Sequence, residues 1–346
     1  METFSKTVSV RENLSNFNSA TVLNEFDNLD YVPTNRMVME ASQVRMLRSG
    51  LLARGMRVLP GSMHPQGRRL AMAPLRIIKS KLSENAETLP AGPLYAVCHS
   101  DWSSGFFHWI TEVLPRMISV RTTFPEAVLV RPTYSSIAEV VAKTIEMLEF
   151  PSEVVAPMDR PLQIPEVCFR SVPWPMGGYH PRDLEEVRNL VLNKTKNPER
   201  TDRRLYISRK RAAYRHIANE NDVVAAVIKR GFEVVYAEDL PFLEQVQLFS
   251  ESEAVVSIHG AGLTNMLWMP KKSAVIEFIK ERERSDSSKA RASDLLNPSY
   301  PRMAALLDHR YAALICKPVQ PNRPAKFADI TVDIAALRDA LDNLGV

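Results

Sequence analysis

The sequence has few cysteines and little net charge. Its cysteines, Cys98, Cys168 and Cys316, number three in 346 residues and form no CxxC pair. This argues against a disulfide framework and against a zinc knuckle, and it is typical of a reducing compartment. The formal net charge is +4. Because that balance is weak for this length, we expect no nucleic-acid partner.

The chain also lacks the apolar segments that direct a protein into or across a membrane. Its first residues, METFSKTVSVRENLSNF, contain no apolar core of a secretory signal. No apolar stretch approaches the roughly 20 residues that a spanning helix needs. We therefore predict a cytoplasmic protein whose association with a membrane, if it has one, is peripheral and at the inner face.

Two missing motifs limit the chemistry. The sequence has no Asp-x-Asp between apolar residues, the pattern that would hold a divalent metal on a diphosphate, so we expect no metal and no cofactor. It has no G-x-S-x-G elbow, which argues against a serine hydrolase that uses residues 259–262 (HGAG) as an oxyanion loop. A zinc site of His108, Glu112 and a distant histidine stays open as an alternative, although His-x-x-x-Glu alone is a weak signal.

The length and composition predict a globular chain of two domains. Hydrophobic residues make up 45% and charged residues 24%, close to globular averages. Residues 1–90 mix short apolar runs with proline, glycine and basic residues, which indicates an irregular capping region. The other predicted parts are an α/β domain (91–195), a second α/β domain (196–320) and a C-terminal helix that packs back (321–346), with the polar segment 194–204 as linker.

Strand and helix patterns alternate from residue 94 onward. In the second half, strands are predicted at 205–208, 233–236, 254–259 and 274–279, with helices between them. This order predicts a parallel sheet with helices on both faces, whose ligands bind beyond the carboxyl ends of the strands. We predict an α/β fold in which two Rossmann-like domains have parallel sheets that face each other across a cleft. Further helices are expected at 105–120, 135–148, 182–193, 220–230, 241–249, 262–269 and 334–344.

The segment IHGAGLTNMLWMP, residues 258–270, is the strongest candidate for a ligand site. A buried-type strand ends there in small residues, and the helix that follows would present unpaired N–H groups to a phosphate. The alternative is a tight turn that needs glycine for its geometry alone. The candidate donor-binding residues of this turn are His259, Gly260, Ala261, Gly262, Leu263, Thr264 and Asn265.

A basic loop follows another strand of the same predicted sheet. The strand brings Ser208 and Arg209 to its carboxyl end, and Arg215 precedes the helix that Glu220 opens. Arginine suits a diphosphate because its planar guanidinium binds pairs of oxygens. A basic loop is also common as plain solvated surface, and Glu220 is alternatively a helix cap.

The first predicted domain contains a histidine and a glutamate at helical spacing, in HSDWSSGFFHWITEVLPR. His108 and Glu112 are four residues apart and therefore share one face of a helix. Glu112 would fix the imidazole tautomer while the other ring nitrogen takes a proton from an acceptor hydroxyl. Asp101 offers a second carboxylate base. The alternative is a core histidine satisfied by its neighbour.

Together these segments resemble a bacterial member of glycosyltransferase family 61, of the type found in capsular polysaccharide biosynthesis. The resemblance spans residues 98–279. Its motifs are His108, Trp109, Glu112 and Leu114 to Arg116; YISR (206–209); Arg215, Ile217, Asn219 and Glu220; GFEVV (231–235); FLEQVQLF (242–249); HGAGLTNMLWMP; and VIEF (275–278).

This resemblance implies a GT-B fold, an inverting reaction and no metal requirement. It implies a nucleotide-sugar donor, with UDP as the carrier and N-acetylglucosamine or a pentose as the sugar, and a glycan or glycolipid acceptor. Arg209 and Arg215 would bind the diphosphate, the HGAGLTN turn the phosphate and sugar, and Glu277 the nucleotide ribose. The alternatives are a nucleotide-sugar-binding protein without transfer activity and, less favoured, the serine-type hydrolase.

Overall fold

A computed structural model describes residues 7–26, 29–64, 67–83, 85–157, 160–281, 296–320 and 327–346. The chain divides into two compact units. We call residues 32–194 the N-terminal unit, and residues 6–31 together with 195–346 the C-terminal unit. The division falls within the polar segment that the sequence marks as a linker.

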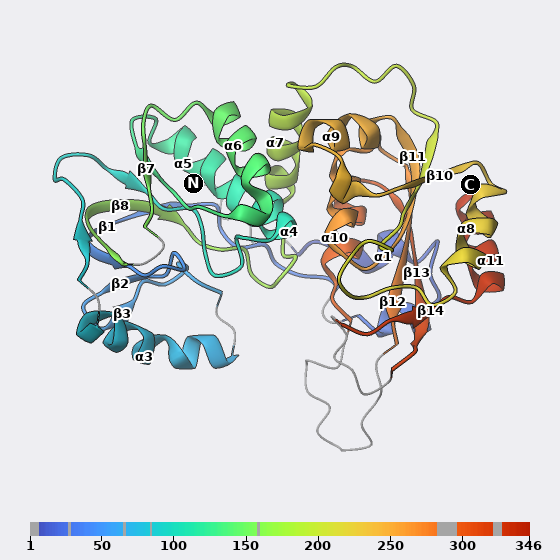
Figure 1. The fold of residues 1–346 in the computed structure, drawn as a ribbon, viewed down its shortest axis with the longest axis horizontal. Helices are drawn as coiled ribbons and strands as arrows, with labels where there is room; N and C mark the ends of the chain where they lie inside the picture. The colour runs from blue at the N-terminus through green and yellow to red at the C-terminus, as the bar shows by residue number, and fades with distance from the viewer. Residues whose placement is uncertain are drawn as a thin grey trace. The chain divides into compact units, whose positions relative to one another are not determined.

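The N-terminal unit is built on an eight-stranded mixed sheet (Figure 1). Its order is β3-β2-β1-β8-β5-β6-β7, and β4 also pairs with β8. The strands from β4 to β8 pair in parallel, whereas β1 pairs with β8 and β2 in antiparallel register. The strands are β1 (Val38–Met46), β2 (Leu52–Arg54), β3 (Arg57–Val58), β4 (Glu87–Thr88), β5 (Tyr95–Ala96), β6 (Val128–Arg131), β7 (Glu153–Val155) and β8 (Leu162–Arg170).

Helices cover both faces of this sheet. In Figure 1, α3 lies on one side and the group α5, α6 and α7 on the other. Apolar side chains of β1, β8 and neighbouring strands form the core. The helical elements are α3 (Gly67–Ser83), α4 (Phe106–His108), the π-helix η1 (Trp109–Val113), α5 (Leu114–Thr123), the 3₁₀ helix η2 (Ser135–Ile137), α6 (Ala138–Leu148) and α7 (Pro181–Leu192).

The C-terminal unit contains a six-stranded sheet in the order β10-β9-β11-β12-β13-β14. Every pair in it is parallel except β13 with β14. Strands β11 and β12 are buried along nearly their whole length, as expected for a sheet covered on both faces. The strands are β9 (Arg203–Ile207), β10 (Phe232–Val235), β11 (Ser252–Ile258), β12 (Ala274–Lys280), β13 (Arg310–Pro318) and β14 (Ile330–Thr331).

Helices flank this second sheet as well, with α8 and α11 on one side and α1, α9 and α10 on the other (Figure 1). The helical elements are α1 (Val10–Leu14), α2 (Ala20–Asn24), α8 (Glu220–Ile228), the 3₁₀ helices η3 (Ala237–Asp239) and η4 (Ala261–Trp268), α9 (Phe242–Ser250), α10 (Ser299–Leu306) and α11 (Ile334–Leu344). The prediction of an α/β chain with parallel strands is confirmed in both units.

The first ninety residues differ from the expected capping region. Residues 10–24 form α1 and α2 of the C-terminal unit, and residues 38–58 supply three strands of the N-terminal sheet. Residues 67–83 form the longest helix of the unit, where irregular structure was predicted. Residues 280–298, a charged and serine-rich segment of the sequence, lie mostly outside the described residues. No helix in the described part of the chain is long and apolar enough to span a bilayer.

Candidate functional site

In the N-terminal unit, His108 and Glu112 lie where a short α-helix passes into a π-helical turn. His108 ends α4, and Glu112 belongs to η1. Nδ1 of His108 lies 2.9 Å from Oε1 of Glu112. Glu112 is almost fully buried, whereas His108 exposes 22% of its side chain. Isolated π-helical turns are frequent at functional sites. Here the turn places the buried carboxylate of Glu112 against the partly exposed imidazole of His108.

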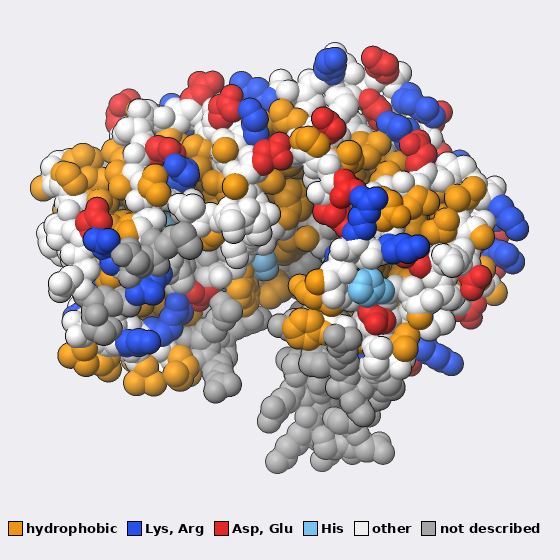
Figure 2. Space-filling view, viewed as in Figure 1, with side chains coloured by type: hydrophobic (Ala, Val, Ile, Leu, Met, Phe, Trp, Pro, Cys, Tyr) orange, Lys and Arg blue, Asp and Glu red, His pale blue; other side chains and the backbone are white. Residues whose placement is uncertain are grey.

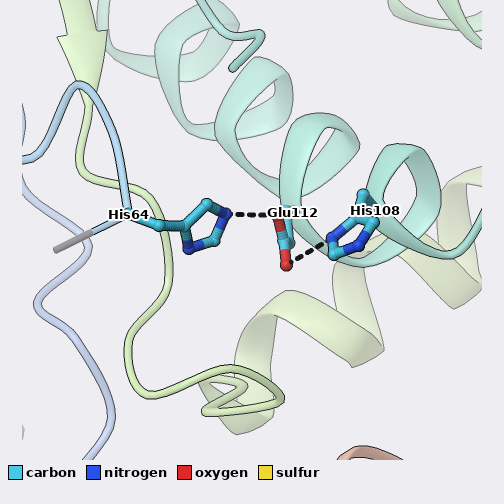
Figure 3. A group of neighbouring side chains, drawn as sticks. All are labelled: His64, His108 and Glu112. Atoms are coloured by element: carbon cyan, nitrogen blue, oxygen red, sulfur yellow. Dashed lines mark hydrogen bonds and ion pairs between the residues drawn. The ribbon is translucent and has the colours of Figure 1, made fainter. Parts of the chain in front are cut away.

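A second histidine completes the group (Figure 3). Nε2 of His64 lies 3.1 Å from Oε2 of Glu112, so the carboxylate stands between two imidazole rings. The ring of His64 is buried and stacks on Trp102 at a centroid distance of 4.3 Å. Its loop packs closely at Gly61, which has a φ of 80° and no room for a Cβ beside Ser171. Sequence reasoning missed His64, because it stands alone in a region without clear periodicity.

Glu112 is the charged member of this group. Burial opposes its ionisation, but hydrogen bonds from His108 and His64 outweigh that effect and lower the pKa of Glu112 to about 2. An ionised carboxylate only accepts hydrogen bonds. The protons in these two bonds therefore belong to Nδ1 of His108 and Nε2 of His64. In neutral His108 this leaves Nε2 as the basic nitrogen.

The same three residues are a candidate for metal binding. Their ligand atoms lie within 4.8 Å of one another, and no other such group occurs among the described residues. Each carboxylate oxygen, however, faces one imidazole nitrogen at hydrogen-bond distance. This arrangement suits a chain of hydrogen bonds that orients His108.

Asp101, the second candidate base, forms a two-pronged ion pair with Arg76. The distances from the guanidinium nitrogens to its oxygens are 3.1 and 3.2 Å. Arg76 also donates to the hydroxyl of Ser49 at 2.6 Å. Since Asp101 is engaged with a cation, a structural role beside the histidines suits it better than proton abstraction.

In the C-terminal unit, Arg209 and Arg215 lie in the loop that follows β9. Burial lowers the pKa of Arg215, and the charge of Arg209 lowers it further. The Nε atoms of both arginines are buried and have no hydrogen-bond partner. A Cβ on residue 260 would lie 2.8 Å from Nη1 of Arg209, so the guanidinium of Arg209 packs closely against the backbone of Gly260. Two neighbouring cations with unsatisfied donors form a suitable site for an anion.

His259 directly follows β11, beside this pair of arginines. Its Nδ1 contacts Oε1 of Glu277, and Tyr311 donates its hydroxyl to Oε2 of the same carboxylate at 2.6 Å. Glu277 is fully buried. Burial raises the pKa of Tyr311, and the charge of Glu277 and the hydrogen bond to it raise this pKa further. Because both oxygens of Glu277 are occupied by protein groups, its geometry favours orienting His259 over contacting a ribose. The hydroxyl of Tyr300 donates to the carbonyl of Gly260 at 2.6 Å and so helps to fix the turn.

Several other predicted donor residues make internal bonds. Ser208 donates to Glu220 at 2.7 Å, and Glu220 also accepts from Tyr206 at 3.0 Å. Asn265 is fully buried and bonds Gln245 and Trp268. Thr264 and Leu263 are fully buried, whereas Ala261 is exposed and Gly262 partly so. Within the turn, His259, Ala261 and Gly262 are therefore the residues best placed to meet a ligand, whereas Gly260 is buried.

Most residues of the two groups fall in one stretch that matches a known family. Residues 106–276 match the Glycosyltransferase 61 family. The match contains His108, Glu112, Arg209, Arg215 and His259, and it ends one residue before Glu277. It covers slightly less than half of the chain, so His64 and the last strands lie outside it.

Curated relatives of this chain are named as glycosyltransferases. The chain is 34% identical over 86 residues to the EGF domain-specific O-linked N-acetylglucosamine transferase of Drosophila melanogaster, covering 24% of this chain and 16% of that protein. It is 33% identical over 100 residues to the beta-1,2-xylosyltransferase XAX1 of Oryza sativa subsp. japonica, covering 28% and 17%. It is 32% identical over 97 residues to the alpha-1,3-arabinosyltransferase XAT2 of the same plant, covering 27% and 16%. The matches thus span about a sixth of the length of these relatives.

Proposed function

We propose that this chain is an inverting, metal-independent glycosyltransferase of the GT-B type. The observation that carries the proposal is the surface histidine, His108, whose Nδ1 is held by a buried, ionised Glu112. This pair lies inside the segment that matches Glycosyltransferase 61. Such an arrangement provides a general base with a fixed tautomer, which a transferase needs for an acceptor hydroxyl.

The proposed reaction is a single displacement. The acceptor oxygen attacks the anomeric carbon, the bond from that carbon to the diphosphate breaks, and Nε2 of His108 takes the hydroxyl proton. Arg209, Arg215 and the backbone N–H groups of the turn after Gly260 stabilise the departing diphosphate in place of a metal. Glu112 and His64 act as positioning residues, and Glu277 holds His259 toward the diphosphate.

The names of the curated relatives support a proposal for the donor and the acceptor. The relatives are named for transfer of N-acetylglucosamine, xylose or arabinose, which supports a UDP-linked N-acetylglucosamine or pentose as donor. We propose a hydroxyl of a glycan or lipid-linked glycan as acceptor, in polysaccharide biosynthesis such as that of a capsule. The reaction would take place in the cytoplasm at the inner face of the membrane.

A binding measurement tests the donor half of this proposal. UDP, GDP, CMP and NAD are titrated into the protein by calorimetry and thermal shift with EDTA present. We expect one nucleoside diphosphate, UDP, to stabilise the fold without metal, by an amount that grows with ligand concentration. Stabilisation by none of them would contradict the donor site. Stabilisation that requires added Mn²⁺ or Mg²⁺ would contradict the metal-independent mechanism.

A further inference from the structure

Helix α3 has two apolar faces, and the N-terminal unit uses one of them. Ala73 and Ile77 are fully buried and belong to a small cluster with Leu47, Leu51 and Ala53. Ser80, one turn further, is also buried and accepts a hydrogen bond from Arg45 at 3.0 Å. Positions 73, 77 and 80 follow helical spacing, so they define the inward face of α3.

The outward face of α3 is apolar as well. Leu75, Ile78 and Leu82 expose 55%, 40% and 82% of their surface. Their spacing of three and four residues forms a stripe opposite the buried positions. Figure 2 shows apolar and basic side chains gathered over α3 at the lower left. A helix that is apolar on both faces leaves one of them for a partner.

The charge around this stripe is of one sign. Residues 67–83 include basic side chains and no acidic one, and Lys79 and Lys81 are exposed at its two edges. Strand β3 contacts α3, and the turn between β2 and β3 adds exposed Arg54 and Arg57. Met56, at the tip of that turn, exposes 46% of its surface. Basic and apolar groups are therefore combined on one surface.

We propose that α3 and the β2–β3 turn together bind the surface of an anionic lipid bilayer. Leucine and isoleucine side chains would enter the boundary between headgroups and acyl chains, and the flanking cations would contact anionic headgroups. A second copy of the chain fits less well. Symmetric pairing would bring the two basic helices together with no acidic residue on either to offset the charge.

This surface belongs to the same unit as the proposed base. Arg76 of α3 pairs with Asp101, and His64 precedes the helix by three residues. The unit that contains His108 would therefore be the one that binds the bilayer. A lipid-linked acceptor requires this, because its lipid stays in the bilayer while its hydroxyl must reach His108. That consequence rests on the proposed function, whereas lipid binding itself does not.

The test is flotation of the full-length chain with vesicles. One set is phosphatidylcholine alone, and the other also contains phosphatidylglycerol. We expect binding to the anionic vesicles and a loss of about a hundredfold in apparent affinity for the double variant Leu75→Glu, Leu82→Glu. Lys79→Glu combined with Lys81→Glu should weaken binding by about tenfold or more. Ile228→Glu, on an equally exposed apolar side chain of α8 (54%), is the matched control and should bind like the parent.

Three outcomes would overturn the proposal: no flotation with either vesicle, equal flotation with both, or a leucine variant that floats like the parent. A concentration-dependent dimer that Leu75→Glu, Leu82→Glu abolishes, without vesicle binding, would assign the surface to a second copy instead. Unchanged thermal unfolding of each variant shows that it is folded, as expected for such exposed positions. Because no nucleotide sugar is present, this experiment can fail while the transferase proposal stands.

Discussion

Each of the two units contains a histidine paired with a buried glutamate, but the side chains around the two pairs differ. In each, a buried glutamate holds Nδ1 of a partly exposed histidine: Glu112 holds His108, and Glu277 holds His259. The second oxygen of Glu112 contacts the imidazole of His64, whereas that of Glu277 accepts from the hydroxyl of Tyr311. The second partner of the glutamate is thus the imidazole of His64 in the N-terminal unit and the phenol of Tyr311 in the C-terminal unit.

The surroundings decide what each histidine can do. Around His108 lie the rings of Trp102 and Phe107, at centroid distances of 5.3 and 5.1 Å. Beside the turn of His259 lie Arg209 and Arg215, whose charges favour an anion. A base needs a neutral imidazole next to an uncharged hydroxyl, and a phosphate site needs cations. The comparison supports the proposal that proton transfer belongs to the N-terminal unit and donor binding to the C-terminal unit.

The largest expected effect is on turnover. His108→Ala should lower kcat by about 10²–10⁴-fold, because the general base is removed. The KM for the nucleotide sugar should change little, since the donor is bound elsewhere. Steady-state transfer to a glycan acceptor measures both constants. A folded His108→Ala protein with near-parent kcat would refute this half of the comparison.

The next expected effect is on stability. It concerns Asp183, a buried carboxylate of the N-terminal unit to which we give a structural role. Asp183 is buried against Arg170, with nitrogen–oxygen distances of 2.9 and 2.6 Å. Asp183→Ala should lower the free energy of unfolding by about 3–5 kcal/mol, because the buried charge of Arg170 loses its carboxylate and Arg36 loses its ion pair with Asp183. Glu153→Ala, which removes an exposed pair with Arg131, should cost less than about 1 kcal/mol. Urea denaturation compares the two, and equal losses would contradict the expectation.

A smaller effect is expected on donor affinity. Arg209→Ala and Arg215→Ala should each weaken UDP binding by about 10–100-fold, because charge-assisted hydrogen bonds to the diphosphate are lost. Arg211 lies in the same loop but is exposed and paired with Asp239, so Arg211→Ala is the control. If all three variants bound UDP equally, the loop would be plain solvated surface.

The last effect is a change in acid stability. The pKa of Glu112 is about 2 in the folded chain against an ordinary 4.5. Ionised Glu112 therefore stabilises the fold above about pH 4.5, and this contribution is lost as the pH falls toward 2. The difference in unfolding free energy between the parent and Glu112→Gln should shrink across that window. A difference that stayed constant would mean that the carboxylate is not held in its charged form.

The sequence predicted the C-terminal unit far better than the start of the chain. Strands β9 to β12 and helix α11 have clear apolar patterns and turns, and they occur within a few residues of the predicted bounds, whereas β13 and β14 were not predicted. In the first ninety residues, by contrast, α3 contains Pro74 and apolar residues on two faces, which obscures its helical period. Strand β1 is held in the sheet mainly by its long antiparallel pairing with β8, a contact between distant segments that local patterns do not contain.

The candidate sites divide in the same way. His108 and Glu112 were predictable because helical spacing alone puts them on one face. His64 was not, because 48 residues separate it from Glu112 and only the tertiary fold joins them. Glu277 was expected at the ribose, but its contacts with His259 and Tyr311 depend on which strands are neighbours in the sheet.

The division of labour between the units is tested most directly by titrating UDP into His108→Ala and Arg209→Ala side by side in the calorimeter, with EDTA present. The account predicts a parent-like Kd for His108→Ala and a Kd raised about tenfold or more for Arg209→Ala. A folded His108→Ala protein that loses UDP binding as severely as Arg209→Ala would contradict it, since His108 would then belong to the donor site.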